Sequence, residues 1–520
     1  MLAALVLAAI AVAALWHSPA WRTRSWDTLE LAIGDNITTF DPALIKDVSG
    51  GRLAALLYPN LVKYGDDEKI TPDAADRWVV GADARTYTFY MREGARFSDG
   101  SPLTSRDVAA SFERALSGAV ASPRAWVLLG IRGAQAFHEG RAGSLEGVTC
   151  QGPAEIRITL ERPSGTFLSL LTMPAAAILP AATARKPFWG VDTLPTAGGP
   201  WRIRKLEPDV AVTLEANPFY FGDKPKLAAV RFRIIKNPFA MAAEFRQGRL
   251  DVIDVPDSFD SFFRQNGTWQ PLMDSVEGQN TFYLGFNCTR APFDNRDFRR
   301  AAAMAIDRKS IIDGVLRGRA TAAVGPIPPG VSGYDAAFKG LPFDREAAKA
   351  EFMRLGVAGR PLEILVMANA DSIVVAQAIA GQLKAAGLTV EVAARERGTF
   401  KSLLAKGDFD MVYYSWVADY ADGENFLAPL FGTSADRGGG NYTAYSNLEV
   451  DALIAKAATT TADAERAEIY GKIVGIVVND APRVFLWHAK RITVRQPWVK
   501  GWALQHVYNA QRFAGVSLQR

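Results

Sequence analysis

Alternating apolar and polar residues mark several strands along the chain. Residues 86–92 (TYTFYMR) place Tyr87, Phe89 and Met91 on one face, and residues 155–160 (EIRITL) alternate in the same way. Such alternation is typical of a strand with one buried face. Further strands are predicted at 230–235, 250–255 and 281–287.

Helical patterns lie between these strands. Thr104 is placed as the N-cap of a helix over 105–116, just after an Asp-Gly turn. Residues 294–316 predict one long helix or two short ones, and residues 467–478 another. The stretch 362–394 reads as strand, helix and strand, which implies a right-handed parallel crossover. The pattern therefore predicts an α/β fold with two lobes, and such folds bind ligands at strand carboxyl ends or between lobes.

Composition narrows the class of protein. A chain of 520 residues is too long to fold around one ordinary hydrophobic core, so two or three domains are expected. Hydrophobic residues make up 49% and charged residues 22%, as in a globular protein. The net charge of +4 is small for this length, which argues against a nucleic-acid-binding protein.

The N-terminus carries an uninterrupted apolar run at residues 2–15. A full membrane span needs about 20 residues, so the run fits the core of a secretory signal better. No basic residue precedes it and no cysteine follows, and Ala20 offers only a weak cleavage site. A signal, an uncleaved anchor and a start upstream of this one remain open, and each predicts an exported protein.

The two cysteines, Cys150 and Cys288, fit no zinc or redox spacing. They are predicted to be two buried thiols or, in an oxidising compartment, one disulfide.

Enzyme and metal motifs are missing from the sequence. There is no P-loop, dinucleotide fingerprint, nucleophile elbow or H-E-x-x-H pattern. Residues 419–424 (DYADGE) fail the calcium-loop pattern, and residues 437–441 predict a flexible loop. No two of the four histidines have metal-ligand spacing; they are His17, His138, His488 and His506. The sequence therefore favours a binding protein without a cofactor or metal over an enzyme.

Six motifs occur in order along the chain: TFDPAL (39–44), YTFYMREGARFSDGSPLTSRDVAASFERAL (87–116), GGPWRI to LEANPFYF (198–221), YLGFNCTRAPFDNRDFRRAAAMAIDRKSII (283–312), SWVADYADGENFL (415–427) and APRVFLWHAKRITVRQPWVKGW (481–502). Together they resemble family 5 of the extracellular solute-binding proteins of bacterial ABC importers, which includes oligopeptide- and dipeptide-binding proteins. Residues 121–140 are more similar to the oligopeptide branch.

The resemblance implies a type II periplasmic-binding-protein fold, with two α/β lobes and an extra domain inserted in the first lobe. It implies a monomeric periplasmic subunit that closes on an extended peptide and delivers it to a permease and ATPase complex. The expected division is a signal or anchor at 1–26, the first lobe at 27–58, 186–282 and 493–520, the extra domain at 59–185, and the second lobe at 283–492.

The resemblance also implies the ligand-binding residues. Residues 35–38, including Asn36 and Ile37, and Ser415–Val417 would offer backbone edges that pair with the peptide. Asp419 would hold the ligand's ammonium group, and Trp416 would pack against a ligand side chain. The alternative for Asp419 is to cap a helix that begins near residue 423, a role that fits Asp422 better.

The partner of the ligand's carboxylate is less well defined by the resemblance. Some relatives place basic residues on the strand before the tryptophan, where this chain has Tyr413 and Tyr414. Arg317 or Arg319 could substitute for them. Three classes of ligand therefore stay open: an ordinary peptide, a modified peptide, and another amine-bearing solute such as a murein peptide or an opine-like compound. An exported hydrolase and a membrane-tethered interaction protein are the alternatives from other classes.

Overall fold

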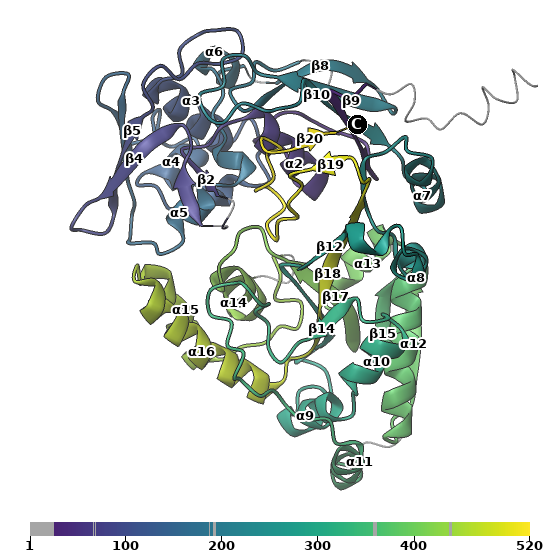
Figure 1. Ribbon diagram of the computed structural model, residues 1–520. Helices are drawn as coiled ribbons and strands as arrows, with labels where there is room; N and C mark the ends of the chain where they lie inside the picture. Colours follow the sequence, from purple (N-terminus) through teal and green to yellow (C-terminus); the bar gives the residue numbers. More distant parts are fainter. Residues whose placement is uncertain are drawn as a thin grey trace, which may run out of the picture.

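The computed structural model describes residues 25–519, except 66, 68, 187, 191–193, 357–360 and 436–438. Three regions are visible in Figure 1: a first half at the top, a second half at the bottom, and a small-sheet region at the upper left. The apolar run at 2–15 lies outside the described residues. Among the residues described, no helix has both the length and the apolar character needed to span a membrane.

The first half consists of residues from both ends of the described chain and from its middle. Its elements are β1 (Thr28–Ile33), α2 (Val48–Leu57), β8 (Trp201–Glu207), β9 (Ala211–Ala216), β10 (Ala229–Ile234), α7 (Pro238–Arg246), β11 (Val252–Asp254), η4 (Asp257–Phe259), α8 (Asp260–Gln265), η5 (Gln270–Leu272), β12 (Met273–Glu277), β19 (Val499–Lys500) and β20 (Ser517–Leu518). Leu29, Leu31 and Ile33 alternate toward the core, and β1 runs parallel to β10 along its whole length. The yellow C-terminal tail in Figure 1 lies beside α2.

The small-sheet region confirms the strands and the helix predicted between residues 86 and 160. It comprises β2 (Val62–Tyr64), β3 (Ile70–Pro72), β4 (Ala75–Val80), β5 (Thr86–Met91), α3 (Ser105–Leu116), η2 (Ala125–Val127), α4 (Ala134–His138), β6 (Val148–Cys150), β7 (Glu155–Thr159), α5 (Phe167–Leu170), η3 (Pro174–Ala176) and α6 (Ala181–Ala184). Strands β4, β5, β7 and β6 form an antiparallel sheet. Helix α3 starts with a reciprocal capping box between Thr104 and Asp107, which fixes its first turn.

The second half contains the predicted parallel crossover, β15–α12–β16. Its elements are β13 (Asn280–Phe286), α9 (Arg296–Met304), α10 (Arg308–Gly314), β14 (Ala320–Ala322), α11 (Arg345–Arg354), β15 (Leu362–Met367), α12 (Ala370–Ala385), β16 (Val390–Arg395), α13 (Arg397–Lys406), β17 (Met411–Val417), α14 (Glu424–Phe431), α15 (Leu448–Thr459), α16 (Asp463–Asp480) and β18 (Arg483–Arg495). The helix predicted at 294–316 is two helices, α9 and α10, because Asp307 caps a new helix through the Ser310 amide.

Strand β18 joins the two halves in one twelve-stranded sheet, in the order β16-β15-β17-β13-β18-β11-β1-β10-β9-β8, with β12 and β14 also paired to β18. Its sequence explains this double role. Residues 483–488 are buried in the second half and residues 492–494 in the first, with half-buried residues 489–491 between them. The chain thus crosses between two separate cores at this strand.

Both cysteines remain thiols. Cys150 lies in β6 of the small-sheet region and Cys288 follows β13 in the second half, and no disulfide joins them. Of the two predicted alternatives, the structure therefore has the pair of thiols; both are half-buried.

Candidate functional site

Strand β17 runs from the core of the second half to an exposed end. Met411 and Val412 are buried and pair with β15, whereas Val417 is 53% exposed. On its other side β17 pairs with β13 along its whole length, as far as Val417. Among the described residues, Ser415–Val417 therefore has a neighbouring strand on one side only. An open strand edge can accept the backbone of an extended guest chain.

Asp419 lies just beyond this edge and is paired with a cation from the small-sheet region. Its Oδ1 atom is 2.7 Å from Nη1 of Arg124, which immediately precedes η2. The two side chains are 22% and 21% exposed. Arg124 Nη2 also donates to the Lys46 carbonyl at 3.5 Å. One guanidinium therefore contacts both the loop before α2 and the loop after β17.

Asn425 holds Trp416 and Asp419 in position. Its side-chain oxygen accepts from the Trp416 indole Nε1 at 3.2 Å and from the Asp419 backbone amide at 3.1 Å. Asn425 is buried in the first turn of α14. The half-buried Trp416 ring lies against Gly440, where a Cβ atom would come within 3.3 Å of the ring. Residues expected to face the ligand are thus tied to a rigid helix start.

The C-terminal tail brings Tyr508 to the same place. Its ring packs on Gly51 of α2 so closely that no side chain fits at residue 51. Burial raises the pKa of the Tyr508 hydroxyl, and the negative charge of Asp419 raises it further, so the phenol stays neutral. Tyr508 was not among the predicted site residues, because nothing in the residues around it reveals that the tail folds back to the end of β17.

Asp422 belongs to the core. Its carboxylate accepts from the Tyr470 hydroxyl at 2.6 Å, from Arg466 Nη2 at 3.0 Å and from the Glu424 amide at 2.9 Å. The last of these bonds satisfies the first amide of α14, as expected of the capping role predicted for Asp422. The Asp419 carboxylate pairs with Arg124 instead, and its backbone amide donates to Asn425.

Asn36 and Ile37, in the loop after β1, have other contacts. The Asn36 amide donates to Asp209 in the turn between β8 and β9, and Ile37 packs partly against the core of the first half. Tyr414 contacts a basic side chain: Lys401 Nζ lies 4.6 Å from its ring centroid and bonds its hydroxyl. These residues are therefore not in one cluster with Asp419 in this structure.

A cavity of about 450 Å³ lies where η4 of the first half faces the second half. Its apolar floor includes Phe282, Tyr413 and Trp487, whose rings lie about 6 Å apart, centroid to centroid. Its cationic side chains are Arg317, Arg319 and Lys490.

The two arginines of this cavity differ in their partners. Arg319 is held by Asp257 and Asp260, each at 2.8 Å, and by the Val255 carbonyl at 2.9 Å. Arg317 Nη1 donates to the neutral Ser261 hydroxyl at 3.1 Å. The sequence offered both arginines as partners of a ligand carboxylate. Arg319 thus pairs with charged residues, whereas Arg317 contacts an uncharged hydroxyl.

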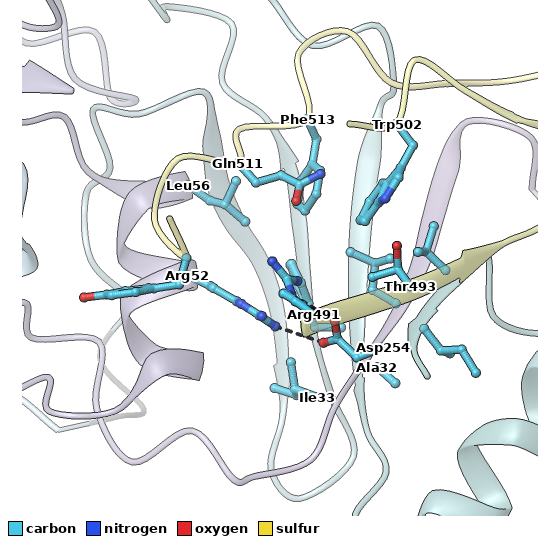
Figure 2. Close-up of a pocket in the computed structure, with 15 residues that line it drawn as sticks. Ala32, Ile33, Arg52, Leu56, Asp254, Arg491, Thr493, Trp502, Gln511 and Phe513 are labelled. Carbon is cyan, nitrogen blue, oxygen red and sulfur yellow. Dashed lines mark hydrogen bonds and ion pairs between the residues drawn. The ribbon is translucent and has the colours of Figure 1, made fainter. Parts of the chain in front are cut away.

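A smaller pocket of about 50 Å³ lies at the carboxyl ends of β1 and β11 (Figure 2). The Asp254 carboxylate forms ion pairs with Arg491 Nε at 3.0 Å and with Arg52 Nη1 at 3.3 Å, and both contacts are drawn in the figure. The Asp254 side chain is 49% exposed, and the two arginines hold the pKa of its carboxyl below the ordinary value. Trp502 and Phe513 of the tail cover the pocket, so it is mostly filled by the protein itself.

The described residues contain no group of three or more histidine, cysteine, aspartate or glutamate side chains that could hold an ion.

Comparisons with known proteins agree with this architecture. The model of the bacterial extracellular solute-binding proteins, family 5, matches residues 69–438. Di/tripeptide-binding protein 4 of Pseudomonas aeruginosa is 28% identical over 506 residues, covering 94% of this chain and 93% of that protein.

Solved structures give the same result. The Helicobacter pylori binding protein DppA, determined with the peptide STSA, is 26% identical with a TM-score of 0.79, covering 97% of this chain and 100% of that one. The murein tripeptide binding protein MppA of Escherichia coli is 24% identical with a TM-score of 0.79, covering 95% and 99%, and at that identity it supports the fold alone. These likenesses confirm the predicted type II binding-protein fold. The chain belongs to family 5 of the bacterial extracellular solute-binding proteins.

Proposed function

We propose that this chain is the substrate-binding subunit of an ABC importer and that it binds extended peptides for delivery to a membrane permease. The observation that carries the proposal is the open edge of β17 at Ser415–Val417, which leaves peptide groups available to a guest backbone. Backbone pairing of this kind is independent of the guest's side chains, which suits a receptor for many peptides.

Charged residues at the ends of this edge would orient the peptide. Asp419 would receive the ammonium group, and Arg317, in the cavity between the halves, would receive the carboxylate. Trp416 would form one wall, fixed by its bond to Asn425. Closure of the halves would bring Asn36 and Ile37 to the opposite side of the guest, with Tyr414 behind the strand.

The domain division expected from the sequence fits this proposal. A first lobe at 27–58, 186–282 and 493–520 and a second lobe at 283–492 would close as two bodies about residues 489–491 of β18. The extra domain at 59–185 would supply Arg124. The subunit would act as a monomer in the periplasm, with or without an N-terminal tether, and its family consists of solute-binding proteins and not of enzymes.

The first test of this function is the ligand itself. Protein purified under native conditions should release peptides of mixed sequence, identified by mass spectrometry after denaturation. Release of a single compound without peptide bonds would replace the proposal with a receptor for that compound.

The second test addresses Asp419. Calorimetric titration with Ala-Ala-Ala and its N-acetylated form should show tighter binding of the free amine. Asp419→Ala should weaken binding of the free-amine tripeptide by about 2–5 kcal/mol, as for removal of one member of a buried charge pair. Its affinity for the acetylated tripeptide should not change. Asp408→Ala is the matched control, because Asp408 is 66% exposed and pairs with Arg290 alone on the surface. Equal binding of both tripeptides by the unaltered protein would rule out the ammonium role.

A further inference from the structure

Two opposite charges stand side by side at the position expected for the ligand's ammonium group. Arg124 Nη1 and Asp419 Oδ1 are 2.7 Å apart, and both side chains are about one-fifth exposed and so remain reachable. A lone ammonium group entering here meets a carboxylate that already has a cation. It must either displace Arg124 or share Asp419 with it.

The pair matches a different chemical group better. An α-amino-acid end carries an ammonium and a carboxylate on the same carbon, and this arrangement complements adjacent Asp and Arg side chains. A guanidinium has five N–H donors in a planar fork, and Arg124 uses its Nη1 for Asp419 and its Nη2 for a long contact to the Lys46 carbonyl. Donors thus remain for a ligand carboxylate while the Asp419 carboxylate, with two oxygens, accepts from the ammonium.

We propose that Arg124 determines specificity by selecting ligands with a zwitterionic α-amino-acid end. This inference rests on the proposed function. In an ordinary peptide the first residue has an ammonium group, but its carboxyl group is consumed in the peptide bond. In an isopeptide linked through a side-chain carboxyl, as in a γ-glutamyl peptide, both charges remain on one carbon. Peptide-like solutes joined through a side chain are therefore the substrate class that this pair fits.

Two constitutional isomers test the inference directly. γ-Glu-Ala-Ala and α-Glu-Ala-Ala have the same atoms and net charge, and only the former keeps ammonium and carboxylate on one carbon. Calorimetric titration of the full chain should give at least about tenfold tighter binding of the γ isomer, which corresponds to one added charge-assisted hydrogen bond. Arg124→Gln should abolish this preference, so that the γ isomer binds no more tightly than the α isomer.

A matched control separates loss of the guanidinium from loss of structure. Arg132→Gln makes the same change in the same region, at a residue 47% exposed that pairs with Glu146. It should keep the preference, and all variants should keep the thermal midpoint within a few degrees. Equal binding of the two isomers, or a preference retained in Arg124→Gln, would overturn the role of Arg124 and leave the peptide-binding function standing. If neither isomer nor Ala-Ala-Ala binds, the proposed function fails, and this inference fails with it.

Discussion

The Asp422 carboxylate and the Arg466 guanidinium form a buried ion pair at 3.0 Å, with both side chains 4% exposed. Asp422 lies only three residues after Asp419, yet its partners come from α16 and from the start of α14. The same short acidic stretch therefore contains one residue that holds the second half together and one that faces the small-sheet region.

Loss of this buried pair should destabilise the protein. Asp422→Asn leaves Arg466 without its buried counter-charge and should lower the free energy of unfolding by about 3 kcal/mol, measured by urea denaturation. Asp463→Asn is the control on the same arginine, because Asp463 is 86% exposed and its ion pair should contribute about 0–1 kcal/mol. Equal effects of the two substitutions would contradict the structural role of Asp422.

Arg317 should recognise the carboxyl end of a peptide. Arg317→Gln should weaken binding of Ala-Ala-Ala by about 1.5–3 kcal/mol, the value of a hydrogen bond to a charged group. It should not change the affinity for the C-terminally amidated tripeptide. Arg290→Gln, on an exposed ion pair with Asp408, provides a surface control in the titration. An amidated tripeptide that binds the unaltered protein as tightly as the acid would exclude this role.

Much of the fold could be predicted from local sequence patterns. Thr104 and Asp107 cap α3 where the sequence placed its start, and the alternation at 86–92 gives β5. These features depend on neighbours within a few residues, so periodicity and capping chemistry reveal them. The split into α9 and α10 remained open, because Asp307 is compatible both with the interior of one helix and with the cap of a second.

Only the part of the candidate site that lies in the second half could be predicted from the sequence. The stretch 415–419 has a recognisable composition, but Arg124 and Tyr508 reach it from residues roughly 300 positions earlier and 90 later. No periodicity connects positions so far apart, and an arginine in a loop is usually a solvated surface residue. The charge that neutralises Asp419 could therefore be found only from the folded chain.

Glu424 should make stability fall as the pH rises. Burial and the charge of Asp422 raise its pKa from 4.5 to about 7 in the folded protein. Between these values the unfolded chain loses the Glu424 proton before the folded chain does, so ionisation favours unfolding. Because the side chain is half-buried, we expect a loss of about 1–2 kcal/mol from pH 4.5 to 7. Glu424→Gln keeps an acceptor for the Tyr420 hydroxyl and should be more stable than the unaltered protein at pH 8, with no difference at pH 4.

His488 should act in the opposite direction over a similar range of pH. It is buried in β18, its Nδ1–H donates to the Asn280 carbonyl at 2.8 Å, and burial lowers its pKa from 6.5 to about 4. The unfolded chain therefore binds a proton that the folded chain excludes, and stability is lost as the pH falls from 6.5 to 4, by at most about 3 kcal/mol. In the unaltered protein this slope and that of Glu424 partly cancel. His488→Asn keeps a donor toward Asn280 and removes the titration, so its free energy of unfolding should rise as the pH falls from 7 to 4.5, when measured by urea denaturation at each pH. A variant whose stability still falls toward pH 4 in parallel with the unaltered protein would show that His488 does not stay neutral in the folded state.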